Sequence, residues 1–124
     1  MKIAVIGAGS IGSRHTRLLR ELHHEVVVVS SYVNNQPNVI NYKSISDALK
    51  HDQFEYVVVA SRTSQHKSDL KELCKAKFTG KVLIEKPLFA SSEKIAKNKF
   101  VFAGVGYNLR FHPAITWLRD TLPQ

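Results

Sequence analysis

The sequence predicts an α/β domain with a doubly wound, mainly parallel sheet, and two observations support this fold class. Short runs rich in β-branched residues recur along the chain and alternate with longer segments of helical periodicity. The runs are continuously apolar, which is typical of strands that are covered on both faces, as in parallel sheets. Strands separated by helices imply right-handed crossovers, so the sheet is expected to carry helices on its faces.

The strand candidates are apolar runs of four to seven residues. The run at 25–29 contains four consecutive valines, and the run at 56–60 reads Tyr-Val-Val-Val-Ala. Such a density of β-branched side chains favours buried strands. A further short strand is predicted at residues 39–40. The main runs occupy residues 2–6, 25–29, 56–60, 81–84 and 99–105.

Amphipathic segments lie between these runs. In the first of them, Ile11, Leu18 and Leu22 fall on one face at the i, i+7, i+11 spacing of a helix. Pro113 suits the first turn of the last segment, where a backbone N–H has no helical partner. Residues 34–38, which read Asn-Asn-Gln-Pro-Asn, are predicted to form a loop. The helix candidates occupy residues 10–22, 46–50, 64–77, 91–97 and 113–122.

The length of 124 residues fits one domain, 1–124, and the composition excludes several classes of protein. A single cysteine, Cys74, rules out an intrachain disulfide framework, and no metal site is predicted because ligand spacing is lacking. No apolar run could span a bilayer or serve as a signal peptide, so a cytoplasmic location without membrane contact is expected. The net charge of +8 indicates an anionic partner. Nucleic acid is not expected, because no helix-turn-helix, zinc-finger or aromatic RNA-binding motif occurs.

A glycine-rich motif follows the first predicted strand directly. Residues 7–12 read Gly-Ala-Gly-Ser-Ile-Gly and fit G-x-G-x-x-G at a strand-to-helix turn. There the first glycine permits the turn, the second lets the backbone approach a pyrophosphate, and the third lets the helix pack on the strand. The alternative is a tight turn without a ligand. In this context the motif predicts a dinucleotide-binding Rossmann fold, with the phosphates at Gly7, Gly9, Ser10, Ile11 and Gly12.

The end of the second predicted strand bears on which dinucleotide binds. A Rossmann fold normally has Asp or Glu there to hold the ribose 2′-hydroxyl, and that carboxylate would repel a 2′-phosphate. This chain has Ser30 and Ser31 instead, and no carboxylate occurs between Val26 and Ser46. No arginine follows Ser30, and Lys43 is the only cation in that stretch. The predicted cofactor is therefore NAD or NADP, and the missing acid favours NADP.

Three polar motifs each follow a predicted strand. Residues 61–66 read Ser-Arg-Thr-Ser-Gln-His, residues 85–87 read Glu-Lys-Pro, and residues 106–113 read Gly-Tyr-Asn-Leu-Arg-Phe-His-Pro. Open α/β sheets bind their ligands at the carboxyl ends of the strands, which is where these motifs fall. The sequence therefore predicts one site at that edge, shared with the glycine-rich turn.

With these motifs the chain resembles the Gfo/Idh/MocA oxidoreductases, the family of glucose-fructose oxidoreductase and inositol dehydrogenase. The resemblance covers nearly the whole chain, and the Glu-Lys-Pro motif together with residues 106–113 makes it specific. It implies that Lys86 is the catalytic residue, because its ammonium would reach the reacting hydroxyl and stabilise a developing alkoxide. The cofactor-binding residues implied at this edge are Ser61, Thr63, Ser64, His66, Glu85, Lys86, Pro87, Asn108 and Arg110.

The resemblance implies a dehydrogenase that moves a hydride between a nicotinamide and a sugar, a cyclitol or a related polyol. Members of the family carry a second domain with the substrate pocket and a general acid/base histidine, and that domain is expected to be absent from residues 1–124. The chain alone is therefore expected to be catalytically incomplete. Two alternatives are a stand-alone or degenerate nucleotide-binding module and a subunit that needs a separate polypeptide for its substrate domain. Exposed sheet edges would also allow a homo-oligomer.

Overall fold

The computed structural model describes residues 1–95 and 97–122, and it confirms the predicted fold class. Within those residues, six parallel strands form one sheet in the order β3-β2-β1-β4-β5-β6. The order reverses between β1 and β4, which are neighbours in the sheet, so a crevice forms where these two strands end. The strands are β1 (Lys2–Ile6), β2 (Glu25–Val29), β3 (Asn41–Tyr42), β4 (Tyr56–Val59), β5 (Lys81–Ile84) and β6 (Phe102–Val105).

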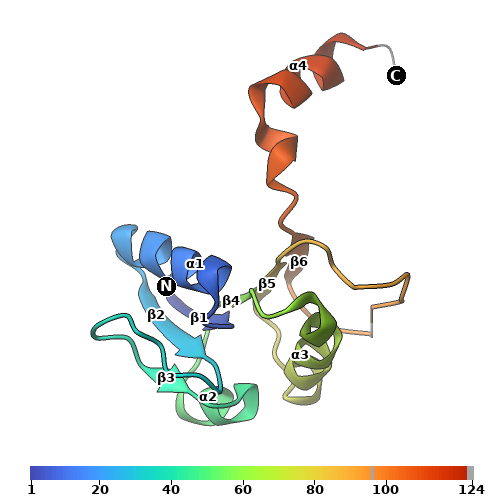
Figure 1. Ribbon diagram of the computed structural model, residues 1–124. Helices are drawn as coiled ribbons and strands as arrows, with labels where there is room; N and C mark the ends of the chain where they lie inside the picture. The colour runs from blue at the N-terminus through green and yellow to red at the C-terminus, as the bar shows by residue number, and fades with distance from the viewer. Residues whose placement is uncertain (96, 123–124) are drawn as a thin grey trace.

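Helices cover both faces of the sheet (Figure 1). Helix α1 packs on one face, and α2 and α3 pack on the other. A short 3-10 helix and α4 follow β6 and extend away from the sheet (Figure 1). The helices are α1 (Ser10–Glu21), α2 (Ile45–His51), α3 (Thr63–Lys75), η1 (Asn108–Phe111) and α4 (Pro113–Thr121).

The continuous valine runs are buried because the strands have apolar neighbours on both sides. On β2, Val27 and Val29 join the core beneath α2 and α3, whereas Val26 joins the core beneath α1. Leu70 and Leu73 of α3 belong to the first of these cores. At roughly 25 cal/mol for each Å² of apolar surface, burial on both faces makes the central strands the main source of stability.

The turn from β1 into α1 depends on glycine at two positions. Gly7 has φ +106°, a conformation that a side chain rarely adopts, and a Cβ there would lie 2.6 Å from the Ala60 carbonyl oxygen. A Cβ on Gly12 would lie 1.9 Å from the Gly7 carbonyl oxygen. The Thr16 hydroxyl, which is buried, donates to the Gly12 carbonyl at 2.9 Å. Helix α1 is therefore in backbone contact with the end of β1, as the third glycine of the motif predicts.

The helix predicted at residues 91–97 is wrong, because residues 91–95 and 97 are irregular and residue 96 lies outside the described residues. Glu93 pairs with Lys67 of α3 and accepts a hydrogen bond from Ser91. Phe89 and Phe100 pack against the core beneath α3. A helix of seven residues would form too few hydrogen bonds to offset the cost of its nucleation. The tertiary contacts therefore determine the conformation of this segment.

Three smaller predictions also need correction. The short strand predicted at 39–40 lies instead at Asn41–Tyr42, although the Ile40 carbonyl accepts from the Val28 N–H at 2.9 Å. The last strand begins at Phe102 rather than at residue 99. The 3-10 helix η1 was not predicted, since a single 3-10 turn leaves no periodic pattern in the sequence. The other elements agree with prediction to within a few residues at each end.

A polar network at the amino edge of the sheet ties β1 to the end of α2. The Lys2 ammonium pairs with Glu25 at 2.8 Å and with Asp52, whose other oxygen accepts from the Tyr42 hydroxyl at 2.8 Å. Hydrogen bonding to Lys2 lowers the pKa of the Asp52 carboxyl below its ordinary value. Lys2 and Glu25 begin their strands, so this pair lies at the edge opposite to the carboxyl ends of the strands.

We expect Gly12→Ala to destabilise the fold by about 3 kcal/mol, because its Cβ would overlap the backbone of Gly7. The matched control is Gly9→Ala, whose Cβ would meet nothing within 4 Å. Urea unfolding followed by circular dichroism measures both variants. Equal stability of the two variants would contradict the packing role given to Gly12.

Candidate cofactor-binding site

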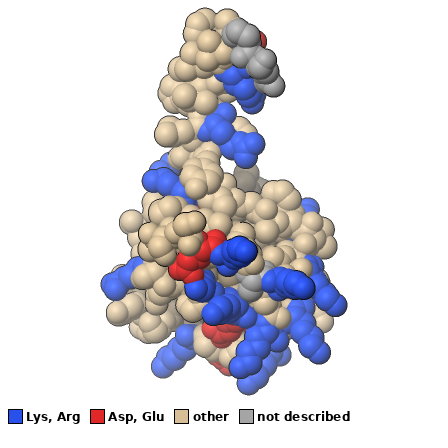
Figure 2. Space-filling view, turned by 90° about the vertical axis from the view of Figure 1, so that its right-hand side faces the viewer, with Lys and Arg blue, Asp and Glu red and all other residues tan. Residues whose placement is uncertain are grey.

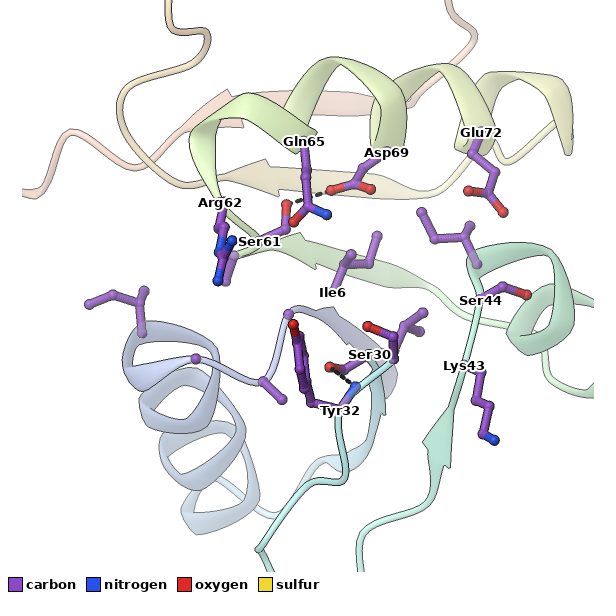
Figure 3. Close-up of a pocket in the computed structure, with 18 of the residues that line it drawn as sticks. Ile6, Ser30, Tyr32, Lys43, Ser44, Ser61, Arg62, Gln65, Asp69 and Glu72 are labelled. Atoms are coloured by element: carbon purple, nitrogen blue, oxygen red, sulfur yellow. Dashed lines mark hydrogen bonds between the residues drawn. The ribbon is translucent and has the colours of Figure 1, made fainter.

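A cavity of about 680 Å³ opens at the carboxyl edge of the sheet, where β1, β2 and β4 end (Figure 3). Its volume is in the range of pockets that hold cofactors and other small ligands. Three walls enclose it: the glycine-rich turn, the end of β2 with the start of α2, and the end of β4 with α3. Apolar side chains of Ile6, Val29 and Ile45 lie between these walls.

The first wall is the glycine-rich turn, and it suits an anion. Gly9 is the N-cap of α1, no side chain caps the helix, and its first turn holds no acidic residue. The first N–H groups of such a helix lack backbone acceptors and carry the positive end of its dipole. A Cβ on Gly9 would stand in open space, so it would project into room that a phosphate could fill. Gly7, Ser10 and Ile11 also line this wall.

The second wall contains Ser30 and Ser31, together with Tyr32 and Lys43. The Ser30 hydroxyl oxygen accepts from the Tyr32 N–H at 3.1 Å, and the Ser30 carbonyl accepts from Asn41 at 3.0 Å. These bonds fix the turn that follows β2, while the Ser30 hydroxyl hydrogen is still able to donate. Tyr32 is exposed, and Lys43 points away from the other labelled residues (Figure 3).

The third wall carries the carboxylates of the cavity. Ser61 follows β4, and its hydroxyl donates to Asp69 at 2.5 Å (Figure 3). Gln65, Asp69 and Glu72 recur at i, i+4, i+7 and so share the face of α3 that lines the cavity. Burial raises the pKa of the Asp69 carboxyl above its ordinary value.

The Glu-Lys-Pro motif lies outside the wall of this cavity, at the end of the neighbouring strand β5. The Glu85 carboxylate meets the His15 ring of α1 at 2.6 Å, so the pair joins the motif to the glycine-rich helix. Lys86 is exposed, and its side chain makes no hydrogen bond or ion pair with the described residues. The peptide bond between Lys86 and Pro87 is cis.

His66 is buried, and its ring connects two loops. Its Nδ1 lies 3.1 Å from the carbonyl oxygens of both Pro87 and Leu88, and its Nε2 lies 3.1 Å from the carbonyl oxygen of Ser61. The ring therefore fixes the loop after Glu-Lys-Pro against the loop after β4. This placement gives His66 a positioning role between the two halves of the carboxyl edge.

The remaining candidates lie at some distance from the cavity wall. Thr63 and Ser64 form the first turn of α3 without lining the cavity, and Gly12 lies beneath the turn. Asn108 and Arg110 belong to η1, where both are exposed, and the Arg110 guanidinium lies 5.6 Å from the centre of the Phe111 ring. The structure thus brings together the glycine turn, the two serines after β2, and Ser61.

Sequence reasoning missed several residues of this edge. The polar positions of α3 could have been found from their i, i+4, i+7 spacing in the predicted helix 64–77. The contact between His15 and Glu85 had no such signal, because it joins residues that are 70 positions apart. The missed residues are His15, Tyr32, Arg62, Gln65, Asp69 and Glu72.

The electrostatic character of the surface agrees with the net charge of +8. Lys and Arg side chains dominate the charged groups on the face shown in Figure 2. Residues 1–95 and 97–122 contain no group of three or more His, Cys, Asp and Glu side chains that could hold a metal ion. In the same part of the chain, none of the helices has the length and apolar character needed to cross a bilayer.

Solved structures share this fold. UDP-N-acetylglucosamine 3-dehydrogenase GnnA from Acidithiobacillus ferrooxidans matches 97% of the chain, with a TM-score of 0.75 and 24% identity. The WlbA (WbpB) dehydrogenase from Thermus thermophilus, in complex with NAD and alpha-ketoglutarate, matches 97% with a TM-score of 0.74 and 20% identity. Myo-inositol dehydrogenase from Lactobacillus casei, in complex with NAD(H) and myo-inositol, matches 97% with a TM-score of 0.75 and 20% identity. At these identities the likeness shows the fold alone.

The chain spans 41%, 45% and 40% of the length of these three solved chains. No curated protein matches it. A family model described as an oxidoreductase family with an NAD-binding Rossmann fold matches residues 1–106. That match includes the glycine-rich turn, all three walls of the cavity and the Glu-Lys-Pro motif. The chain therefore belongs to the Gfo/Idh/MocA family of oxidoreductases, of which it contains the NAD-binding Rossmann domain.

Proposed function

We propose that this chain binds NAD(P) in the cavity at the carboxyl edge, as one domain of an oxidoreductase that acts on a sugar, a cyclitol or a related polyol. The observation that carries the proposal is the glycine turn beside the cavity. Its helix start is uncapped, and the space in front of Gly9 is open. Both features suit a pyrophosphate, which needs backbone donors and room for close approach.

The strand order supports one orientation of the dinucleotide across the turn. Strand β2 lies on one side of β1, and β5 lies on the other, beyond β4. With the pyrophosphate at the turn, the adenosine half extends toward Ser30 and Ser31, and the nicotinamide half extends toward Glu85 and Lys86. The bound nicotinamide supplies the hydride chemistry, and the surrounding protein binds and orients it.

In this proposal the role of Lys86 is electrostatic. Its exposed ammonium is free to donate a hydrogen bond to a substrate hydroxyl and to stabilise the alkoxide that develops there. The contact between His15 and Glu85 holds the residue next to Lys86 against α1, so the motif has a fixed position relative to the turn. The myo-inositol bound in the Lactobacillus casei enzyme supports a polyol as the substrate class.

Gly9→Val is expected to weaken NADH binding at least tenfold and to leave the fold intact, because its side chain would fill the space proposed for the pyrophosphate. Fluorescence titration of NADH measures the affinity, and thermal unfolding checks stability. Gly80→Ala is not a suitable control, since its Cβ would meet the Phe78 ring and the Glu55 carbonyl. Ser68→Ala on the exposed side of α3 is suitable, and it should bind as the unmodified chain does. Unchanged affinity in Gly9→Val would contradict the proposed site.

The missing acid after β2 predicts that NADP is preferred to NAD. We expect 2′,5′-ADP to bind at least threefold more tightly than 5′-AMP, because Ser30 and Ser31 stand after β2 in place of the usual carboxylate and their hydroxyls can donate to the 2′-phosphate. Calorimetric titration of both ligands tests this. Ser31→Glu should reverse the order by restoring the repulsion. Equal binding of the two ligands would rule out the preference and would leave the NAD(P) site itself in place.

In an oxidoreductase that includes a substrate domain, Lys86→Met is expected to lower turnover of a responsive polyol at least 100-fold, with the dissociation constant of NADH changed by less than threefold. Lys81→Met is the matched control, since Lys81 is an exposed lysine at the other end of the same strand. A panel of sugars and cyclitols, followed by NAD(P)H absorbance, gives the measurement. Binding without turnover in the unmodified chain would favour a nucleotide-binding module, or a subunit that needs a separate substrate domain.

A further inference from the structure

The adenosine half of the cavity ends on the polar face of α3. Gln65 and Asp69 point toward the cavity beside Ser61, whereas Glu72 lies near Ser44 at the start of α2 (Figure 3). The inference below rests on the proposed binding of NAD(P). With the pyrophosphate at the turn and the ribose at the end of β2, the base occupies what is left of the cavity, between β2 and α3.

The chemistry of that space matches an adenine ring. Ile6, Val29 and Ile45 offer apolar surface to the faces of a planar base. The polar side chains of Ser61, Gln65 and Asp69 line the same space, where the edge of such a base would lie. A base in this position therefore has its hydrogen-bonding groups turned toward α3.

Asp69 has an acceptor that is not used. One of its oxygens accepts from the Ser61 hydroxyl at 2.5 Å, and the other has no hydrogen-bond partner among the described residues. The side chain is partly buried, and burial raises the pKa of the carboxyl. Asp69 lines the cavity, so this second oxygen is available to accept a hydrogen bond from the N–H of a ligand bound there.

We propose that Asp69 selects adenine over other purines by accepting a hydrogen bond from the exocyclic amino group of the base. An ionised carboxylate can only accept, so it matches the amino group of adenine and repels the oxo group that hypoxanthine has at the same position. Gln65, one turn earlier on α3, has both a donor and an acceptor for the neighbouring ring edge. Asp69 thereby determines base specificity at the adenosine end of the site.

Glu72 provides the matched control because it is the next carboxylate on the same face of α3. One of its oxygens accepts from the Ser46 N–H at 3.0 Å, in the first turn of α2. Its role is accounted for by this contact between α2 and α3. A general effect of acidic charge in the cavity would appear in variants of both residues, whereas base recognition would appear in variants of Asp69 alone.

The experiment compares NADH with reduced nicotinamide hypoxanthine dinucleotide by fluorescence titration at neutral pH. We expect the unmodified chain to bind the adenine form about tenfold more tightly, the usual worth of one well-placed contact to a base edge. Asp69→Asn can still accept from Ser61 while its amide group donates to an oxo group, so the preference should fall below threefold or reverse. Glu72→Gln should keep the tenfold preference. Titrations of ADP and IDP should give the same pattern if recognition lies at the adenosine end.

Several outcomes would overturn the inference. Equal affinity of the unmodified chain for the two dinucleotides would show that the site does not distinguish adenine from hypoxanthine. This result does not depend on whether any variant folds, and it would not contradict the proposed NAD(P) site. An unchanged preference in Asp69→Asn, or an equal loss of preference in Glu72→Gln, would remove Asp69 as the selecting residue. Failure of the unmodified chain to bind either dinucleotide would overturn the proposed function and this inference together.

Discussion

Helix α1 can begin at the end of β1 only because two glycines leave the strand and the helix in backbone contact. A Cβ on Gly12 would overlap the Gly7 carbonyl, and a Cβ on Gly7 would overlap the backbone after β4. This close approach directs the uncapped start of α1 into the crevice between β1, β2 and β4. The position of the cavity and the orientation of its glycine-rich wall both depend on that contact, as does the orientation proposed for a bound dinucleotide.

Much of this arrangement could be predicted because the information is local. The valine runs specify strands buried on both faces, and the glycine spacing specifies a turn whose geometry excludes side chains at two positions. The carboxyl-edge location of the polar motifs followed from strand direction alone. Long, strongly patterned segments carry such information because every residue in them favours the same structure.

The parts that escaped prediction depend on contacts between distant segments. Residues 91–95 and 97 read as a helical stretch, but Glu93 bonds to Lys67 and the flanking phenylalanines pack into the core, so the segment is irregular. The ring of His66 lies among three backbone carbonyls, two of which belong to residues more than 20 positions away along the chain. The spacing of Gln65, Asp69 and Glu72 marks one polar face of α3, but only the packing of that helix on the sheet turns this face toward the cavity.

The ion pairs that Lys2 makes with Glu25 and Asp52 lie at the amino edge of the sheet, at the other end of β1 from the glycine-rich turn. The ion pairs that hold β1 against β2 and the end of α2 are thus formed by residues that do not line the cavity. Mutations at Ser31, Lys43 or Asp69 can then accumulate without loosening the framework, and effects at separated positions are usually additive. The nucleotide preference of the domain can therefore change during evolution while its fold stays the same.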